Sequence, residues 1–226
     1  MVSDFGETLH HMAAPVVGKS ARTRARLVAA TRAAIRARGT FTAADVAARA
    51  EVVPATFYAH FASRGDALAA AFAATLDEVV DLVGAHLDPA RLDPARPDRG
   101  APAVLAAFVD ALVDFFAREA RVFRAALGDL ATNPGVRATY RAHEESAMAH
   151  LVPFVAAVRG TGPDDPAVVP VARALLVAGQ GLDNPLLFTG EHSDAERAVL
   201  VAGLCALVTA DPRTPPSPRR PPGRPA

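Results

Sequence analysis

Apolar residues recur at intervals of three or four along most of this 226-residue chain, and no stretch alternates convincingly at the two-residue period of a strand. The clearest stripe consists of Leu68, Phe72, Leu76, Val79 and Val83. Residues spaced in this way lie on one face of an α-helix and bury that face against a neighbour. The pattern therefore predicts an all-α fold.

Glycine and proline residues divide the helical pattern into about nine segments. Gly39 is typical of a helix end, Pro54 of a first helical turn, and Ser63 of a residue that caps a helix N-terminus. The helices are predicted at residues 20–38, 43–50, 54–61, 63–87, 103–118, 119–131, 135–159, 166–188 and 193–209. Three prolines within these segments are expected to kink or end them: Pro153, Pro170 and Pro185. The Pro- and charge-rich stretch 88–102 is predicted to be a surface loop.

Composition excludes several classes of protein. Half of the residues are apolar, so the chain can bury a sizeable core, and its one cysteine rules out a disulfide framework. No Cys/His spacing suits a structural zinc site, and no apolar stretch reaches the roughly 18–20 residues of a membrane span. The first eleven residues lack the apolar region of a signal peptide. We expect a cytoplasmic protein with no membrane contact, metal or cofactor.

The net charge of zero hides an asymmetry along the chain. Residues 18–68 carry nine basic and three acidic side chains, whereas residues 69–210 carry eleven basic and eighteen acidic ones. A small basic segment joined to a larger acidic one indicates that one end of the molecule meets a polyanion. A solvated basic helix face would produce the same charge pattern, so charge alone leaves both interpretations open.

The short segments 43–50 and 54–61, joined by a brief turn, have the proportions of a helix-turn-helix motif. In that motif the second helix enters the major groove of DNA with its N-terminal residues first. The small or hydrogen-bonding residues at its start are Pro54, Ala55 and Thr56, while Tyr58, His60 and Arg64 offer polar or charged tips for phosphates. A generic helical hairpin with exposed polar residues is the alternative.

Residues 56–64 read TFYAHFASR, and this string resembles the TetR/AcrR family of bacterial transcriptional regulators. The resemblance covers roughly residues 20–70. It implies that Phe57 and Phe61 are core residues of a DNA-binding domain. By the same resemblance, Thr42, Tyr58, His60 and Arg64 would contact phosphates, and Pro54, Ala55 and Thr56 would face base edges.

Three features depart from the family pattern. Glu51 stands in the turn where the family usually has glycine, and Val53 stands where serine usually caps the recognition helix. The stretch between Gly39 and Val46 is also about two residues shorter than is common. A valine cannot cap, and a glutamate places negative charge near DNA. These departures motivate an alternative function, a ligand-binding helical dimer with a weakened reading head that acts through protein contacts.

For the acidic part of the chain, the resemblance implies a ligand pocket and a dimer interface. Candidate pocket residues are Phe108, Leu112, Phe115, Phe116, Phe123, Tyr140, His143 and Glu144. Mostly apolar side chains with a few polar groups suit a drug-sized ligand. For each aromatic residue taken singly, ordinary core packing remains the simpler interpretation. His143 could equally be a core histidine whose hydrogen bonds are satisfied.

The last two helices, within 166–188 and 193–209, are too apolar to face water alone, so we expect a homodimer through them. No nucleophile elbow, phosphate loop or HExxH motif is present, and we expect no enzyme activity. The expected organisation is a flexible arm at 1–18, a helix-turn-helix domain at 19–68, a ligand-binding and dimerisation domain at 69–210, and a disordered Pro/Arg tail at 211–226. The expected function is a ligand-responsive regulator, a repressor, that binds a palindromic double-stranded DNA operator and is released by a small apolar or amphipathic effector.

Overall fold

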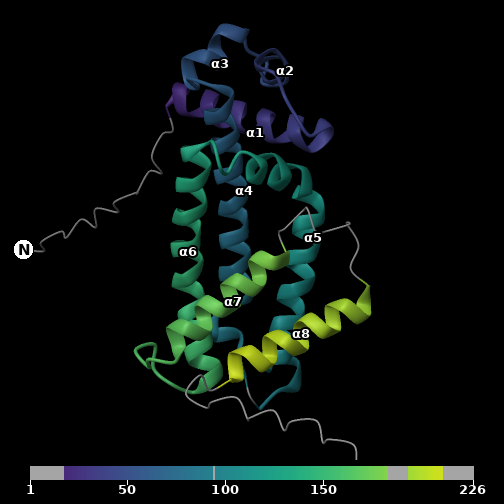
Figure 1. The fold of residues 1–226 in the computed structure, drawn as a ribbon, viewed down its shortest axis with the longest axis vertical. Helices are drawn as coiled ribbons and strands as arrows, with labels where there is room; N and C mark the ends of the chain where they lie inside the picture. The colour runs from purple at the N-terminus through teal and green to yellow at the C-terminus, as the bar shows by residue number, and fades with distance from the viewer. Residues whose placement is uncertain (1–17, 94, 183–192, 211–226) are drawn as a thin grey trace, which may run out of the picture.

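The computed structural model describes residues 18–93, 95–182 and 193–210, and within these ranges every regular element is helical. Helices α1–α3 lie at one end of the elongated molecule, and α4 runs from them into a bundle formed with α5 to α8 (Figure 1). The predicted all-α fold is therefore confirmed. The predicted N-terminal arm at 1–18 and the predicted tail at 211–226 lie outside the described residues, except for Gly18.

The head of the molecule comprises α1 (Lys19–Arg38), α2 (Ala43–Arg49) and α3 (Pro54–His60). Gly39 ends α1 in the left-handed conformation, with φ of 76°, which glycine adopts without steric cost. The small core between these helices is built from fully buried side chains: Leu27, Ala34, Ile35, Val46, Ala47 and Phe57. Each comes from an apolar position of the sequence pattern, so the local periodicity and the packing agree.

The body comprises α4 (Arg64–His86), α5 (Ala101–Gly128), α6 (Pro134–Arg159), α7 (Val168–Leu182) and α8 (Asp194–Thr209). Ser63 caps α4 by accepting a hydrogen bond from the Asp66 amide at 3.1 Å. Helix α4 packs against both α5 and α6, while α7 and α8 cross the half of the bundle far from the head (Figure 1). The predicted loop at 88–102 contains two single 3₁₀ turns, Pro89–Arg91 and Pro97–Arg99.

One predicted helix boundary is wrong. The two helices expected at 103–118 and 119–131 form the single helix α5, so the described residues contain eight α-helices rather than nine. Arg118 and Glu119 are good helix formers, and no glycine or proline stands near them to end the helix. Helix α6 likewise continues through Pro153, and Pro170 lies in the first turn of α7, where proline is tolerated. Pro185 lies outside the described residues.

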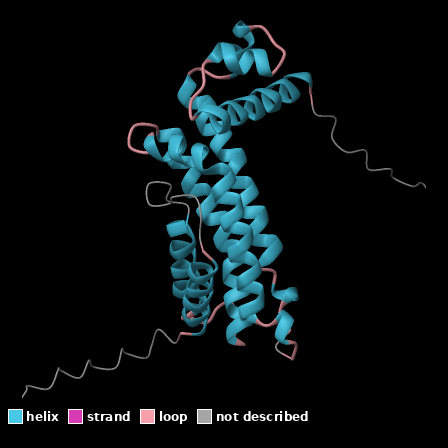
Figure 2. Ribbon diagram, turned by 90° about the vertical axis from the view of Figure 1, so that its right-hand side faces the viewer, coloured by secondary structure: helices cyan, strands magenta, loops and turns pink. Residues whose placement is uncertain are grey.

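The division of the chain at residues 68 and 69 remains a prediction. That boundary falls inside α4, which is continuous from Arg64 to His86. Helix α4 runs from the head into the bundle (Figure 2), and its contacts with α1 extend as far as Glu78, which binds Arg32. A rigid helix shared by both parts offers a direct mechanical connection between them.

Candidate DNA-reading face and ligand pocket

Helix α3 presents a polar face outward at the far end of the head (Figure 1). The side chain of Tyr58 is 61% exposed, while its neighbours in the motif, Phe57 and Phe61, are buried and hold the helix from behind. The rings of Phe57 and Phe61 pack at 5.4 Å between centroids. Pro54 and Ala55 are also exposed, and Thr56 and His60 are half-buried at the edge of the face. All five predicted groups of α3 therefore lie on or beside one accessible surface.

The turn from α2 to α3 closes with two backbone hydrogen bonds, from Val52 to Ala47 at 3.0 Å and from Glu51 to Ala48 at 3.2 Å. This is the Schellman pattern, which needs a left-handed residue after the helix cap. That residue is Glu51, whose φ is 54°. Among the described residues, it is the one residue other than glycine with a positive φ. A side chain there costs energy that glycine would avoid.

The start of α3 lacks a side-chain cap. Val53 has the extended backbone of a capping residue, yet its side chain accepts no hydrogen bond. It does not pack into the core either, because it is 66% exposed. Pro54 has no amide hydrogen, and the Thr56 amide donates to the Val53 carbonyl at 2.9 Å. This leaves the Ala55 amide without a capping side chain.

Thr42 and Arg64 flank the face from neighbouring elements. Thr42 caps α2 in a reciprocal arrangement with Asp45, and the hydrogen bond from the Thr42 hydroxyl holds the pKa of Asp45 below its ordinary value. The guanidinium of Arg64 lies over the Phe41 ring at 5.1 Å and donates to the Thr40 hydroxyl at 3.4 Å. Both residues are exposed. Stacking restricts Arg64 while leaving its charge accessible.

Two arginines counted in the basic segment point into the molecule instead. Arg32 and Arg36 on α1 bind Glu119 of α5, a carboxylate with no exposed surface. Arg32 also forms a bidentate pair with Glu78 of α4, which lowers the pKa of Glu78 chiefly through that hydrogen bond. Burial, together with nearby Arg32, lowers the pKa of Arg36. These ion pairs join the head to α4 and α5.

Glu119 was not among the predicted site residues. It stands on the buried stripe of α5, in line with Leu112, Phe116 and Phe123. A single carboxylate within an apolar stripe is the signal that could have revealed it, because buried charges require partners. Arg121, two residues further, donates to the Arg36 carbonyl at 2.8 Å and also to the Ala37 carbonyl, so it binds the C-terminal turn of α1.

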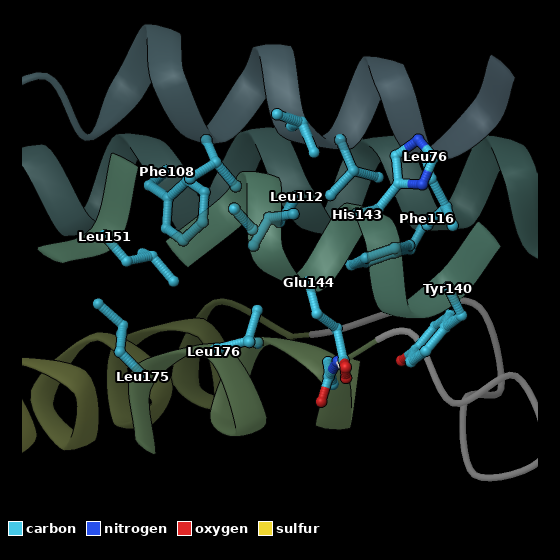
Figure 3. A pocket seen from close by; sticks show the side chains of 16 residues that line it. Leu76, Phe108, Leu112, Phe116, Tyr140, His143, Glu144, Leu151, Leu175 and Leu176 are labelled. Carbon is cyan, nitrogen blue, oxygen red and sulfur yellow. Dashed lines mark hydrogen bonds between the residues drawn. The ribbon is translucent and has the colours of Figure 1, made fainter. Parts of the chain in front are cut away.

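A cavity of about 70 Å³ lies among α4, α5, α6 and α7 (Figure 3). Six of the eight predicted ligand residues line it: Phe108, Leu112, Phe116, Tyr140, His143 and Glu144. Leu76, Leu151, Leu175 and Leu176 add to its apolar wall, and Gln180 lies beside Glu144. Tyr140, His143 and Glu144 lie toward one end of the cavity, where Leu76 is also found, and Leu151 and Leu175 lie at the other (Figure 3).

Phe115 and Phe123 do not line this cavity, contrary to expectation. Both are almost fully buried, and Phe123 packs edge-to-face against Phe72 and Phe116 at 5.4 and 5.0 Å. Their positions on α5 turn them toward the bundle core. Spacing on one helix could not separate core-facing from cavity-facing rings, because that depends on where α7 lies.

His143 is engaged through both ring nitrogens. Nδ1 lies 2.7 Å from the Thr139 carbonyl oxygen, and Nε2 lies 2.8 Å from a carboxylate oxygen of Asp77 on α4. Glu144 accepts a hydrogen bond of 2.7 Å from the side-chain amide of Gln180 on α7. Within the described ranges, no cluster of His, Cys, Asp or Glu could hold a metal ion, and no helix is long and apolar enough to cross a membrane.

Comparison with known proteins shows the fold. A proposed transcriptional regulator from Streptomyces coelicolor is 23% identical, with a TM-score of 0.64 over 84% of this chain and 99% of that chain. A proposed TetR-family transcriptional regulator from Mesorhizobium loti is 17% identical, with a TM-score of 0.67 over 84% and 95%. GusR from Salmonella enterica is 19% identical, with a TM-score of 0.60 over 86% and 99%. No family model and no curated protein sequence matches the chain. The chain has the fold of TetR-family transcriptional regulators, in agreement with the resemblance carried by residues 56–64.

Proposed function

We propose that this protein is a transcriptional regulator that binds a palindromic operator as a homodimer and releases it when a small molecule enters the cavity. The observation that carries the proposal is the exposed face of α3, backed by two buried phenylalanines and flanked by Arg64. Such a face can enter the major groove without rearranging the head. The resemblance of residues 56–64 to TetR/AcrR regulators and the shared fold support the same conclusion.

On DNA, the start of α3 would read bases and its surroundings would bind phosphates. Pro54, Ala55 and Thr56 are small enough for close approach to base edges. Arg64 and Tyr58 would fix the register of the helix on the backbone.

The outer surface of α8 supports a homodimer. Its exposed residues include six that are small or apolar, Ala195, Ala198, Val199, Ala202, Gly203 and Ala206, while Asp194, Glu196 and Thr209 near its ends are exposed and polar. Val199 is 72% exposed, and Val177 on α7 is 60% exposed. On its inner side, α8 is held by Arg197, whose pKa is raised by its hydrogen bond to Asp110 of α5. Pairing this apolar surface with a second copy would remove it from water.

Release would follow from a change in the shape of the bundle. The cavity wall includes Leu76 and Val79 of α4, and the first turn of that same helix carries Arg64. A ligand that binds better when α4 has moved would favour a dimer whose two reading heads are wrongly spaced.

Selection from random DNA duplexes at low salt tests this function. The full chain is expected to enrich a palindrome with half-sites about 34–36 Å apart. Arg64→Ala should weaken binding to all duplexes and reduce the salt slope by about one, whereas Thr56→Ala should alter base preference. Arg141→Ala removes one positive charge from the exposed side of α6 and is the matched control. It should change neither the affinity for DNA nor the base preference.

Failure to enrich any palindrome with a folded dimer would overturn the regulator function. It would favour the alternative of a weakened reading head, for which Glu51 and the uncapped Val53 are the structural grounds.

A further inference from the structure

The polar end of the cavity is formed by Tyr140, His143, Glu144 and Gln180, and its acidic group is the carboxylate of Glu144. Among the described lining residues there is no lysine or arginine, and the acidic one is Glu144. Its recorded hydrogen bond is to the neutral amide of Gln180, at 2.7 Å. The other carboxylate oxygen of Glu144 remains for a ligand.

His143 does not balance this charge. The two groups facing its ring, the Thr139 carbonyl and the Asp77 carboxylate, are both acceptors. Both ring nitrogens are therefore engaged within the protein, and neither is left to bind a ligand.

We propose that the cavity binds an amphipathic molecule whose head is a hydrogen-bond-donating cation, such as a primary ammonium or amidinium. The head binds the Glu144 carboxylate in place of the Gln180 amide, and the apolar part lies along Phe108, Leu112 and Leu151. The inference deepens the proposed function, because it names the effector class of the sensing cavity. An anionic head would instead face Glu144 in apolar surroundings, where unpaired like charges are costly.

Binding must also widen the cavity. Its volume of about 70 Å³ is below the roughly 300–1,000 Å³ of ligand pockets in general. The Gln180–Glu144 hydrogen bond ties α7 to α6 at the polar end. A cationic head that takes over the carboxylate loosens this tie, so that α7 can separate from α4 and α5 as the apolar part enters.

Calorimetric titration of the full chain with three probes tests the inference. Decylamine, decanol and decanoate share one apolar tail and differ only in the head. Decylammonium is expected to bind at least about tenfold more tightly than decanol, the usual worth of a charge-assisted hydrogen bond, and decanoate most weakly. Equal or tighter binding of decanoate, or no binding of any probe, would overturn the inference.

Three variants locate the effect. Glu144→Gln should bring decylammonium to within about twofold of decanol, whereas Glu145→Gln, on the exposed side of the same helix turn, should leave the preference intact. Gln180→Ala should tighten decylammonium binding, because it removes the competitor for the carboxylate. A preference for decylammonium that survives in Glu144→Gln would place the cation elsewhere, for example on the apolar face of α8, and would refute the proposed site.

The titrations contain no DNA, so they are independent of operator binding. A chain that binds decylammonium through Glu144 but enriches no palindrome refutes the regulator function alone. A chain that enriches a palindrome but prefers decanoate refutes the cationic effector alone.

Discussion

Glu119 at the junction of head and body and Glu144 at the end of the cavity are both carboxylates on long helices of the bundle, and their surroundings differ. Glu119 has no exposed surface and pairs with Arg32 and Arg36, with Arg118 at 3.5 Å. Glu144 is half-buried and has the neutral Gln180 amide as its recorded partner. The first carboxylate is saturated with donors and joins two parts of the molecule. The second retains the capacity to bind, which is what a ligand site needs.

The largest expected effect comes from removing the carboxylate of Glu119. Glu119→Ala leaves Arg32 and Arg36 close together and without their shared partner, so the free energy of unfolding should fall by about 3–5 kcal/mol. Urea denaturation monitored by circular dichroism measures it. Glu144→Ala should cost far less, because only one hydrogen bond, from the neutral Gln180 amide, is lost. A loss below about 1 kcal/mol at Glu119 would mean that the junction is not stabilised by these ion pairs.

A second expected effect concerns the start of α3, which has no side-chain cap. Val53→Ser supplies the missing acceptor at the start of α3 and should stabilise the protein by about 0.5–2 kcal/mol. Because Val53 is 66% exposed, the swap loses little buried apolar surface. Thermal melts with and without operator DNA measure the gain. A lower midpoint for the Ser variant would show that Val53 contributes packing instead.

A third effect on stability, of similar size, is expected at the turn before α3. Glu51→Gly relieves the left-handed conformation of a residue with a side chain and should stabilise the head by about 1 kcal/mol. Glu51→Gln is the control, since it removes the charge and keeps the strain. If both variants gain equally in denaturant unfolding, charge and not backbone conformation is the cause.

The smallest effect is a dependence on pH at the junction. Arg32 lowers the pKa of Glu78 below its ordinary value of 4.5, so this pair stabilises the fold above that pH and is lost as pH falls through the lowered pKa. Glu78 is 46% exposed, and water screens the pair, so the contribution is about 0.2–1 kcal/mol. Comparing unfolding free energies at pH 7 and pH 3 for the wild type and Glu78→Gln measures it. A wild type that loses no more stability on acidification than the variant would contradict the prediction.

Prediction from the sequence succeeded where a feature depends on nearby residues. The helix end at Gly39 and the cap at Ser63 agree with the structure, since each involves residues within one turn. The predicted break between Arg118 and Glu119 is wrong because the role of Glu119 depends on residues far away in the sequence. A charged residue in an apolar stripe resembles a boundary when its partners on α1 are unknown.

Local sequence alone therefore specified the helices, their caps and the reading motif, because backbone hydrogen bonds and aromatic spacing act over a few residues. Only the tertiary arrangement decided which charges became internal. Arg32 and Glu119 are 87 positions apart, and they meet because α1 crosses α5. Likewise, α7 decides that Phe116 borders the cavity while Phe115 packs in the core. The cost of burying a charge or a ring depends on what surrounds it, and those surroundings come from distant parts of the chain.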